Sequence, residues 1–123
     1  MFFFRRGSGR GTSGRLTPHQ AHRRTRSGEA VLLDVREISE WKAGHAPDAV
    51  HLPLSRLLTG AELPVGVAGR PVVAICRSGN RSQQAAKHLA AKGIEAVDVR
   101  GGMTAWTQAG LPVVGVGKGG SAA

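Results

Sequence analysis

The chain has 123 residues, 41% of them hydrophobic, with a single cysteine and a formal net charge of +9. This length supports one domain with one core, and a single cysteine excludes an intrachain disulfide. Nothing in the composition therefore requires an oxidising compartment, and we expect a cytoplasmic protein.

The positive charge is concentrated in the first 28 residues, which contain seven arginines and no acidic residue. The remaining residues carry ten lysines or arginines against eight acidic residues, which is close to balance. Residues 1–15 lack the apolar core of a secretory signal and cannot span a membrane. We expect a disordered basic arm over residues 1–15, a folded domain over residues 16–115 and a flexible tail over residues 116–123.

The basic arm has two interpretations besides a solvated extension. Its serines and arginines, without acidic residues, loosely fit an organellar transit peptide, so organellar targeting stays open. A basic arm can also contact RNA or anionic surfaces without sequence preference. Because the charge of the domain itself is nearly balanced, we expect no nucleic-acid partner for the domain and interpret the arm as a solvated extension.

Helix and strand signals alternate along the chain after this arm. Thr17 is a candidate N-cap, Pro18 suits the first helical position and Gln20 can complete a capping box. These signals predict a helix that ends at about Arg26. The apolar run at residues 30–35 then predicts a buried strand of a parallel sheet.

The middle of the chain contains several shorter signals. Ser39 is expected to cap a short helix that a glycine ends. A short strand at residues 49–53 and a helical turn at residues 54–58 follow, and then a loop rich in glycine and proline. The next apolar run predicts a strand that ends at Cys76.

The last third of the chain continues the alternation. Ser82 is a candidate cap for a helix that ends at Gly93, residues 96–99 predict a fourth strand, and a short helix after it carries Trp106 inward. Strands that alternate with helices predict an α/β fold, with a small central parallel sheet flanked by helices on both faces. Binding sites in such sheets form beyond the C-terminal ends of the strands, where Cys76 is expected.

The stretch "CRSGNRS" at residues 76–82 has the features of an anion-binding loop. It lies between a predicted strand and a predicted helix, so backbone N–H groups and the positive end of the helix dipole can face an anion. Gly79 permits a sharp bend, and Arg77 and Arg81 add positive charge. Because helix N-termini and cations lower a cysteine pKa from ~8.5 toward roughly 3.5 to 7.5, these surroundings favour a reactive thiolate over a buried structural cysteine.

Four motifs carry a family resemblance. They are "LLDVRE" at residues 32–37, "GHAPDAVHLPL" at residues 44–54, "CRSGNRS" at residues 76–82 and "DVRGGMTAW" at residues 98–106. In their order and spacing they resemble the rhodanese superfamily, and specifically its single-domain members of the thiosulfate sulfurtransferase type. The resemblance extends from Ala30 to about Val114, and it implies the rhodanese-like α/β fold.

The resemblance also implies a reaction in two halves. Cys76 takes the outer sulfur of a donor such as thiosulfate and becomes a persulfide, and an acceptor such as cyanide or a thiol then removes that sulfur. The loop residues that form the cradle around Cys76 would be Arg77, Ser78, Gly79, Asn80, Arg81 and Ser82. Asp34 and Arg36 match a pair at a strand end near the loop, which implies a supporting role.

The length of the loop distinguishes two chemistries within this superfamily. Phosphatase relatives have five residues between the cysteine and the arginine, and their wider ring accommodates phosphate. Here Arg81 lies five positions after Cys76, so four residues intervene. The shorter ring resembles the sulfurtransferase form.

Other residues that could take part in catalysis or binding have simpler structural interpretations. His45 and His51 could be proposed as bases or metal ligands, but one cysteine and scattered histidines do not make a tetrahedral metal set. We therefore expect no metal and no cofactor. Trp41 and Trp106 could stack on nucleobases, but each lies on a short predicted helix with apolar neighbours, where packing onto the sheet is the simpler use.

Two hypotheses about function follow. The first is an enzyme that moves sulfane sulfur from thiosulfate or a low-molecular-weight persulfide to a thiol or cyanide. The second is a sulfur-relay or binding module without efficient turnover, which passes the sulfur to a partner protein. The expected partners are a small anionic sulfur donor and a thiol or cyanide acceptor, with a thioredoxin-like protein as one candidate acceptor. We expect a monomer that does not contact a membrane.

Overall fold

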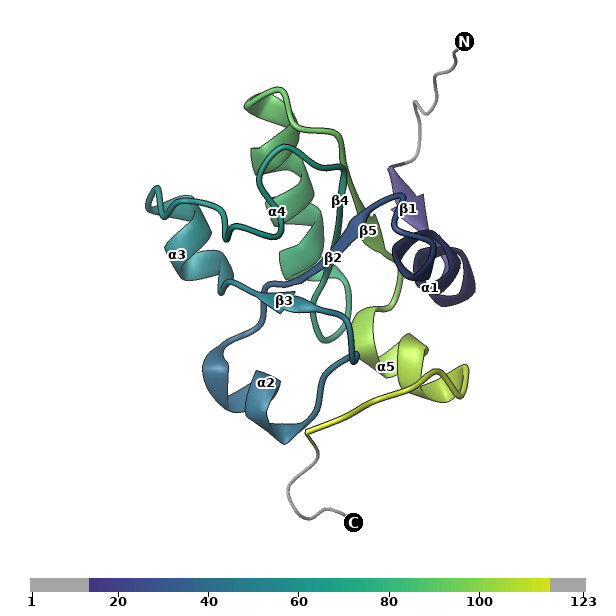
Figure 1. Ribbon diagram of the computed structural model, residues 1–123. Coiled ribbons are helices and arrows are strands. Elements are labelled where there is room, and N and C mark those ends of the chain that lie inside the picture. The colour runs from purple at the N-terminus through teal and green to yellow at the C-terminus, as the bar shows by residue number, and fades with distance from the viewer. Residues whose placement is uncertain (1–13, 116–123) are drawn as a thin grey trace, which may run out of the picture.

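The structure, a computed structural model, describes residues 14–115 (Figure 1). The elements in chain order are β1 (Arg15–Leu16), α1 (Pro18–Arg26), β2 (Val31–Asp34), α2 (Ile38–Ala43), β3 (Val50–His51), α3 (Leu54–Leu58), β4 (Val72–Ile75), α4 (Asn80–Ala91), β5 (Ala96–Val99) and α5 (Gly102–Gln108). The strands form one sheet in the order β1-β5-β4-β2-β3, and every pairing is parallel. This confirms the predicted α/β fold with a small parallel sheet.

The two faces of the sheet bury different side chains. On one face, Leu33 and Ala74 pack with side chains of α3 and α4, including Leu57 and Leu89. Alternate residues of the same strands face the other way, toward α1 and α5. Because both faces are covered, β2 and β4 are buried along their whole length, which is why they appear in the sequence as continuous apolar runs (Figure 1).

The first strand is an element that the sequence did not predict. Arg15 was expected in the disordered arm, but it pairs with Asp98 in the sheet, and Leu16 pairs with Val99. Two residues carry no readable periodicity, and this strand is held by backbone hydrogen bonds and by the charge of Arg15. Residues 1–13 and 116–123, on which the rest of the predicted arm and the predicted tail fall, lie outside the described residues.

Two predicted helix caps are wrong. The N-cap of α2 is Glu37, whose backbone N–H bonds to the carboxylate of Glu40, so Ser39 lies inside the helix. The N-cap of α4 is Gly79, and Ser82 lies in the first turn with its side chain buried. The predicted capping box of α1 is present, with Thr17 and Gln20 bonded reciprocally.

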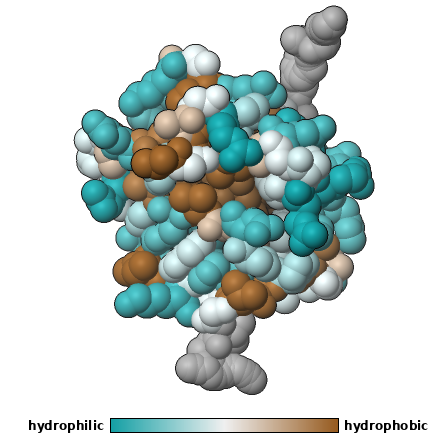
Figure 2. Space-filling model, in the orientation of Figure 1, coloured by the Kyte–Doolittle hydropathy of each residue, from teal (hydrophilic) through white to brown (hydrophobic). Residues whose placement is uncertain are grey.

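The visible surface is mostly hydrophilic, with apolar side chains in smaller groups (Figure 2). Large hydrophobic side chains that remain exposed in residues 14–115 lie on different segments: Ile38, Leu58, Val65 and Val114. Within the same residues, no helix combines the length and the hydropathy needed to cross a lipid bilayer.

Candidate active site

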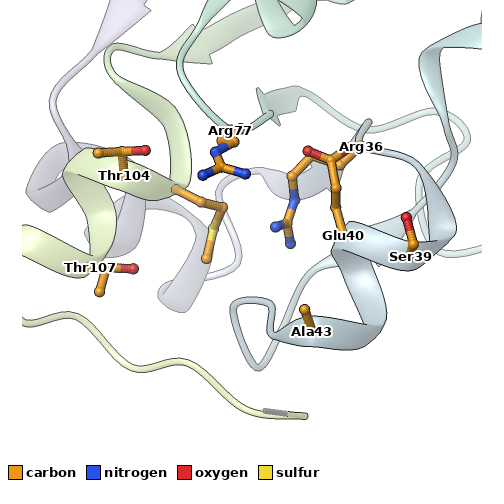
Figure 3. A pocket seen from close by; sticks show the side chains of 8 residues that line it. Arg36, Ser39, Glu40, Ala43, Arg77, Thr104 and Thr107 are labelled. Carbon is orange, nitrogen blue, oxygen red and sulfur yellow. The ribbon is translucent and has the colours of Figure 1, made fainter. Parts of the chain in front are cut away.

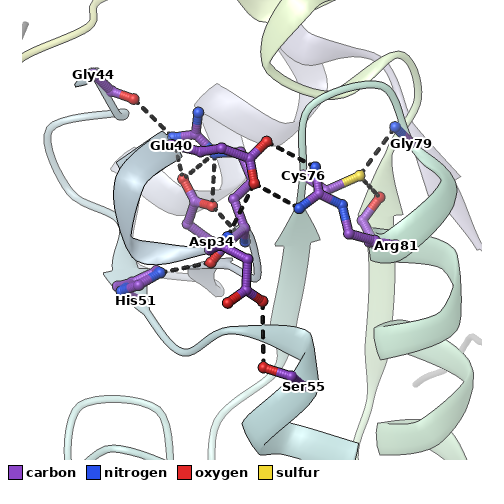
Figure 4. Close-up of polar contacts among 11 residues, drawn as sticks. Asp34, Glu40, Gly44, His51, Ser55, Cys76, Gly79 and Arg81 are labelled. Carbon is purple, nitrogen blue, oxygen red and sulfur yellow. Dashed lines mark hydrogen bonds and ion pairs between the residues drawn. The ribbon is translucent and has the colours of Figure 1, made fainter. Parts of the chain in front are cut away.

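Cys76 follows β4 directly and lies at the start of the loop that leads into α4 (Figure 4). Its side chain is buried, with the residue only 1% exposed. The backbone N–H of Gly79 donates a hydrogen bond to Sγ over 3.0 Å, and the thiol donates to the hydroxyl of Ser82 over 3.4 Å. The loop therefore curls around the sulfur and offers it a backbone donor.

Gly79 is the residue that permits this curl. Its φ of +111° is left-handed, and an added Cβ would lie 2.7 Å from the guanidinium of Arg15 and 3.3 Å from the backbone nitrogen of Gly101. No other residue type fits this conformation and this space without strain. The 12-residue helix α4 begins immediately afterwards, so the positive end of its dipole faces the loop.

A series of polar contacts extends from the sulfur through Ser82 and Asp98 to Arg15. The hydroxyl of Ser82 donates to a carboxylate oxygen of Asp98 over 2.7 Å, and Asp98 is 1% exposed. Arg15 pairs with the same carboxylate, Nε to Oδ1 at 3.0 Å, and also contacts the carbonyl oxygen of Gly79. Neither Asp98 nor Arg15 was expected at the site from the sequence, although an acidic residue inside an apolar strand signals a buried charge that needs a partner.

Asp34 and Arg36 form a second buried ion pair at the end of β2. The guanidinium of Arg36 meets both carboxylate oxygens of Asp34, at 2.8 to 3.1 Å, and also donates to the carbonyl oxygen of Gly44 over 2.7 Å. The carbonyl oxygen of Arg36 accepts a hydrogen bond from the His51 ring. The pair thus fastens both ends of α2 to the sheet (Figure 4).

The side chain of Arg81 reaches from α4 to α2. Its two terminal nitrogens donate to the two carboxylate oxygens of Glu40 over 2.7 and 2.9 Å (Figure 4). The hydrogen bond from Arg81 is the main reason that the pKa of Glu40 falls from 4.5 to about 2. The same hydrogen bond raises the pKa of the Arg81 guanidinium. Glu40 is a further site residue that sequence analysis missed, because nothing local connects it with the loop.

This ion pair gives the stability of the protein a specific pH dependence. Because the pKa of Glu40 in the fold lies below its ordinary 4.5, the pair stabilises the fold above that pH, and its contribution is lost as the pH falls toward about 2. We expect a Glu40→Gln variant to be less stable than the wild type at pH 6. Denaturant unfolding at a series of pH values should show the two proteins converging near pH 2 to 3. A constant difference down to that pH would contradict the assignment.

An open cleft of about 430 Å³ lies beside the loop, between α2 and α5 (Figure 3). Its lining residues are Arg36, Ser39, Glu40, Ala43, Arg77, Met103, Thr104 and Thr107. The Arg77 side chain reaches into this cleft (Figure 3). Among the ion pairs of residues 14–115, none involves Arg77. Arg77 is therefore the cradle arginine whose charge is available to an anion.

The other residues considered from the sequence have varied surroundings. Ser78 lies in the loop and Asn80 is the first residue of α4, and both are exposed. Trp106 packs in the core, and Trp41 stacks on the rings of His45 and His51, of which His51 belongs to strand β3 of the sheet. No group of three or more potential ligands within the described part of the chain could hold a metal ion.

Fold and site together define a class of protein. A buried cysteine lies beyond the C-terminal end of a central parallel strand, inside a loop that directs the backbone N–H of Gly79 at its sulfur and leads into a helix. A helix N-terminus and a backbone N–H donor suit a negatively charged sulfur or a small anion. The class is that of α/β proteins with a buried cysteine in the loop between a parallel strand and the N-terminus of a helix.

Comparison with known proteins identifies the family within this class. A family model described as the rhodanese-like domain matches residues 17–109. The chain belongs to the rhodanese-like family. It resembles a solved rhodanese-related protein of Thermoplasma volcanium with a TM-score of 0.70 and 29% identity, over 81% of this chain and 96% of that one.

Two curated relatives carry names that describe an activity. The chain is 40% identical, over 70% of its length, to a protein of Allochromatium vinosum named sulfurtransferase, and it covers 79% of that protein. It is 38% identical, over 80% of its length, to the adenylyltransferase and sulfurtransferase UBA4 of Yarrowia lipolytica. It spans only 24% of UBA4, so the chain corresponds to one part of that longer protein.

Proposed function

We propose that this protein is a sulfurtransferase that carries sulfane sulfur as a persulfide on Cys76. The thiolate of Cys76 attacks the outer sulfur of thiosulfate, a new sulfur–sulfur bond forms, and sulfite leaves with the electron pair of the broken bond. Cyanide then attacks the outer sulfur of the persulfide, thiocyanate leaves, and the thiolate is restored. A persulfide donor and a thiol acceptor follow the same scheme, with thiolates as the leaving groups.

The observation that carries this proposal is the surrounding of Sγ. The backbone N–H of Gly79 points at the sulfur, and α4 begins at the loop, so negative charge on Sγ or on a sulfur bonded to it is stabilised. Arg77, beside the cysteine, offers positive charge to an incoming anionic donor. The family membership and the sulfurtransferase relatives support the same chemistry.

A second candidate is a sulfur relay, in which Cys76 passes its sulfur to a partner protein with little turnover of small molecules. The observation that favours it is the similarity to part of the longer UBA4, named an adenylyltransferase and sulfurtransferase. In such an arrangement the acceptor is presented by protein contacts and not by diffusion. A thioredoxin-like protein is one acceptor that could act in either case.

Intact-mass measurement tests the common step of both candidates. After incubation with thiosulfate or a small persulfide, the protein should gain the mass of one sulfur atom, and dithiothreitol should remove it. A protein that gains no sulfur from any sulfane donor would refute both candidates. Steady-state formation of thiocyanate then separates them, because an enzyme turns over with thiosulfate and cyanide, whereas a relay module forms the adduct and turns over poorly.

A further inference from the structure

We propose that Glu40 selects the sulfur donor, because its ion pair with Arg81 favours organic persulfides over the thiosulfate dianion. The inference deepens the proposed sulfurtransferase function and rests on it, since it concerns the donor of the first half-reaction. Three features carry it: the contact between Glu40 and Arg81, the balance of charge at the site, and the size of the cleft.

The ion pair with Glu40 engages the guanidinium of Arg81, which is the group that would otherwise bind an anion. Both terminal nitrogens of Arg81 donate to the two oxygens of Glu40, over 2.7 and 2.9 Å. Both side chains are partly buried, with 32% of the Arg81 side chain and 24% of the Glu40 side chain exposed. A donor that needs Arg81 must displace a two-point ion pair, and it must do so with Glu40 still at the rim of the cleft.

The charges at the site leave one arginine for the donor. Arg36 is neutralised by Asp34 and Arg81 by Glu40, and Arg77 lacks an acidic partner within residues 14–115. Before the negative charge of the Cys76 thiolate is counted, the cleft and the loop therefore present about one net positive side-chain charge. Thiosulfate carries two negative charges, whereas a persulfide group carries at most one. A dianion in this site would face the Glu40 carboxylate with half of its charge unmatched.

The cleft is also larger than thiosulfate requires. Its volume of about 430 Å³ lies in the range of sites for organic ligands, whereas thiosulfate is a small tetrahedral anion. Its walls combine the hydroxyls of Thr104 and Thr107 on α5 with the apolar side chains of Met103 and Ala43. Such a lining suits the organic part of a persulfide, R–S–SH, and offers a tetrahedral anion only Arg77 as an unpaired cation.

Transfer of sulfur from such a persulfide to Cys76 needs no further reactant. The Cys76 thiolate attacks the outer sulfur of R–S–SH and forms a new sulfur–sulfur bond. The original S–S bond breaks, its electron pair leaves with R–S⁻, and the proton stays on the transferred sulfur. The leaving thiolate then takes a proton from water. No oxidant is consumed, since the sulfur keeps its oxidation state.

The experiment compares two donors on the wild type and on Glu40→Gln. The rate constant for sulfur addition to Cys76 is measured by intact mass with thiosulfate and with the persulfide of 2-mercaptoethanol, which is small and carries at most one charge. Freeing Arg81 should raise the thiosulfate rate constant about tenfold relative to the persulfide rate constant. An unchanged ratio of the two rate constants would overturn the proposal.

Glu37→Gln is the matched control. Glu37 lies at the start of the same helix, and its substitution by glutamine removes the same charge. Among the described residues, Glu37 forms no ion pair with Arg81. Its ratio of rate constants should stay within about twofold of the wild type. An equal shift in both variants would show that overall charge, and not the release of Arg81, selects the donor.

The first of two further measurements tests the proposal if Glu40→Gln does not fold, and the second tests it if no sulfur is transferred. The double variant Glu40→Gln/Arg81→Gln preserves the net charge and should keep a wild-type ratio. A large loss of thiosulfate use there would show that Arg81 binds the anion despite Glu40. Calorimetric binding of thiosulfate to Cys76→Ser proteins should tighten about tenfold with Glu40→Gln. This binding test needs no transfer, so it separates failure of donor selection from failure of the proposed function.

Discussion

A Cys76→Ser variant is expected to gain no sulfur from any sulfane donor. The hydroxyl of serine stays protonated at neutral pH and cannot form the persulfide, so both half-reactions lose the atom that carries the sulfur. The chain contains no other cysteine that could substitute for it. Intact mass after incubation with thiosulfate, and the rate of thiocyanate formation, should both fall to the level of a sample without protein.

The fold of this variant should survive. A serine hydroxyl can accept the hydrogen bond from the Gly79 N–H and donate to Ser82, as the thiol does. We expect a change in the free energy of unfolding of about 1 kcal/mol, measured by thermal or denaturant unfolding. Sulfur addition that persists in the folded variant would contradict the assignment of Cys76 as the sulfur carrier.

Replacing Gly102 with alanine should damage both stability and activity. The N-terminus of α5 rests on the active-site loop, where the Met103 and Thr104 N–H groups donate to the carbonyl oxygens of Cys76 and Arg77 over 2.7 and 3.0 Å. A Cβ on Gly102 would collide with the Cys76 carbonyl oxygen and lie 2.6 Å from the carbonyl group of Arg77. The helix must then move away from the loop, and both hydrogen bonds are lost.

The expected loss of stability combines two costs. A left-handed φ of +55° costs alanine about 1–2 kcal/mol, and the collision adds about 1–3 kcal/mol. Gly110→Ala is the matched control, because its φ of +76° is also left-handed but nothing lies within 4 Å of the added Cβ. Denaturant unfolding should show a larger loss for Gly102→Ala, and sulfur addition should slow only in that variant. Equal effects would mean that the contact of α5 does not shape the loop.

Most of the elements could be predicted because their signals are local. The capping box at Thr17 and the apolar runs of β2 and β4 report backbone geometry within a few residues, so their positions agree closely with the structure. The predicted N-caps of α2 and α4 were wrong because several residues near each helix start can act as caps. In the structure the N-caps are Glu37 and Gly79. Strand β1 is too short to carry a pattern.

The order of the elements after β1, the rhodanese-like resemblance and the place of Cys76 in a loop between a strand and a helix could all be predicted from the sequence alone. Only the tertiary structure decided which charges meet there. Arg15 and Asp98 are 83 residues apart, and Glu40 and Arg81 are 41 apart. Local periodicity does not encode such pairs, because they depend on the strand order β1-β5-β4-β2-β3 and on where α2 docks. The fold therefore leaves Arg77 unpaired among the described residues, while Arg81 pairs with Glu40.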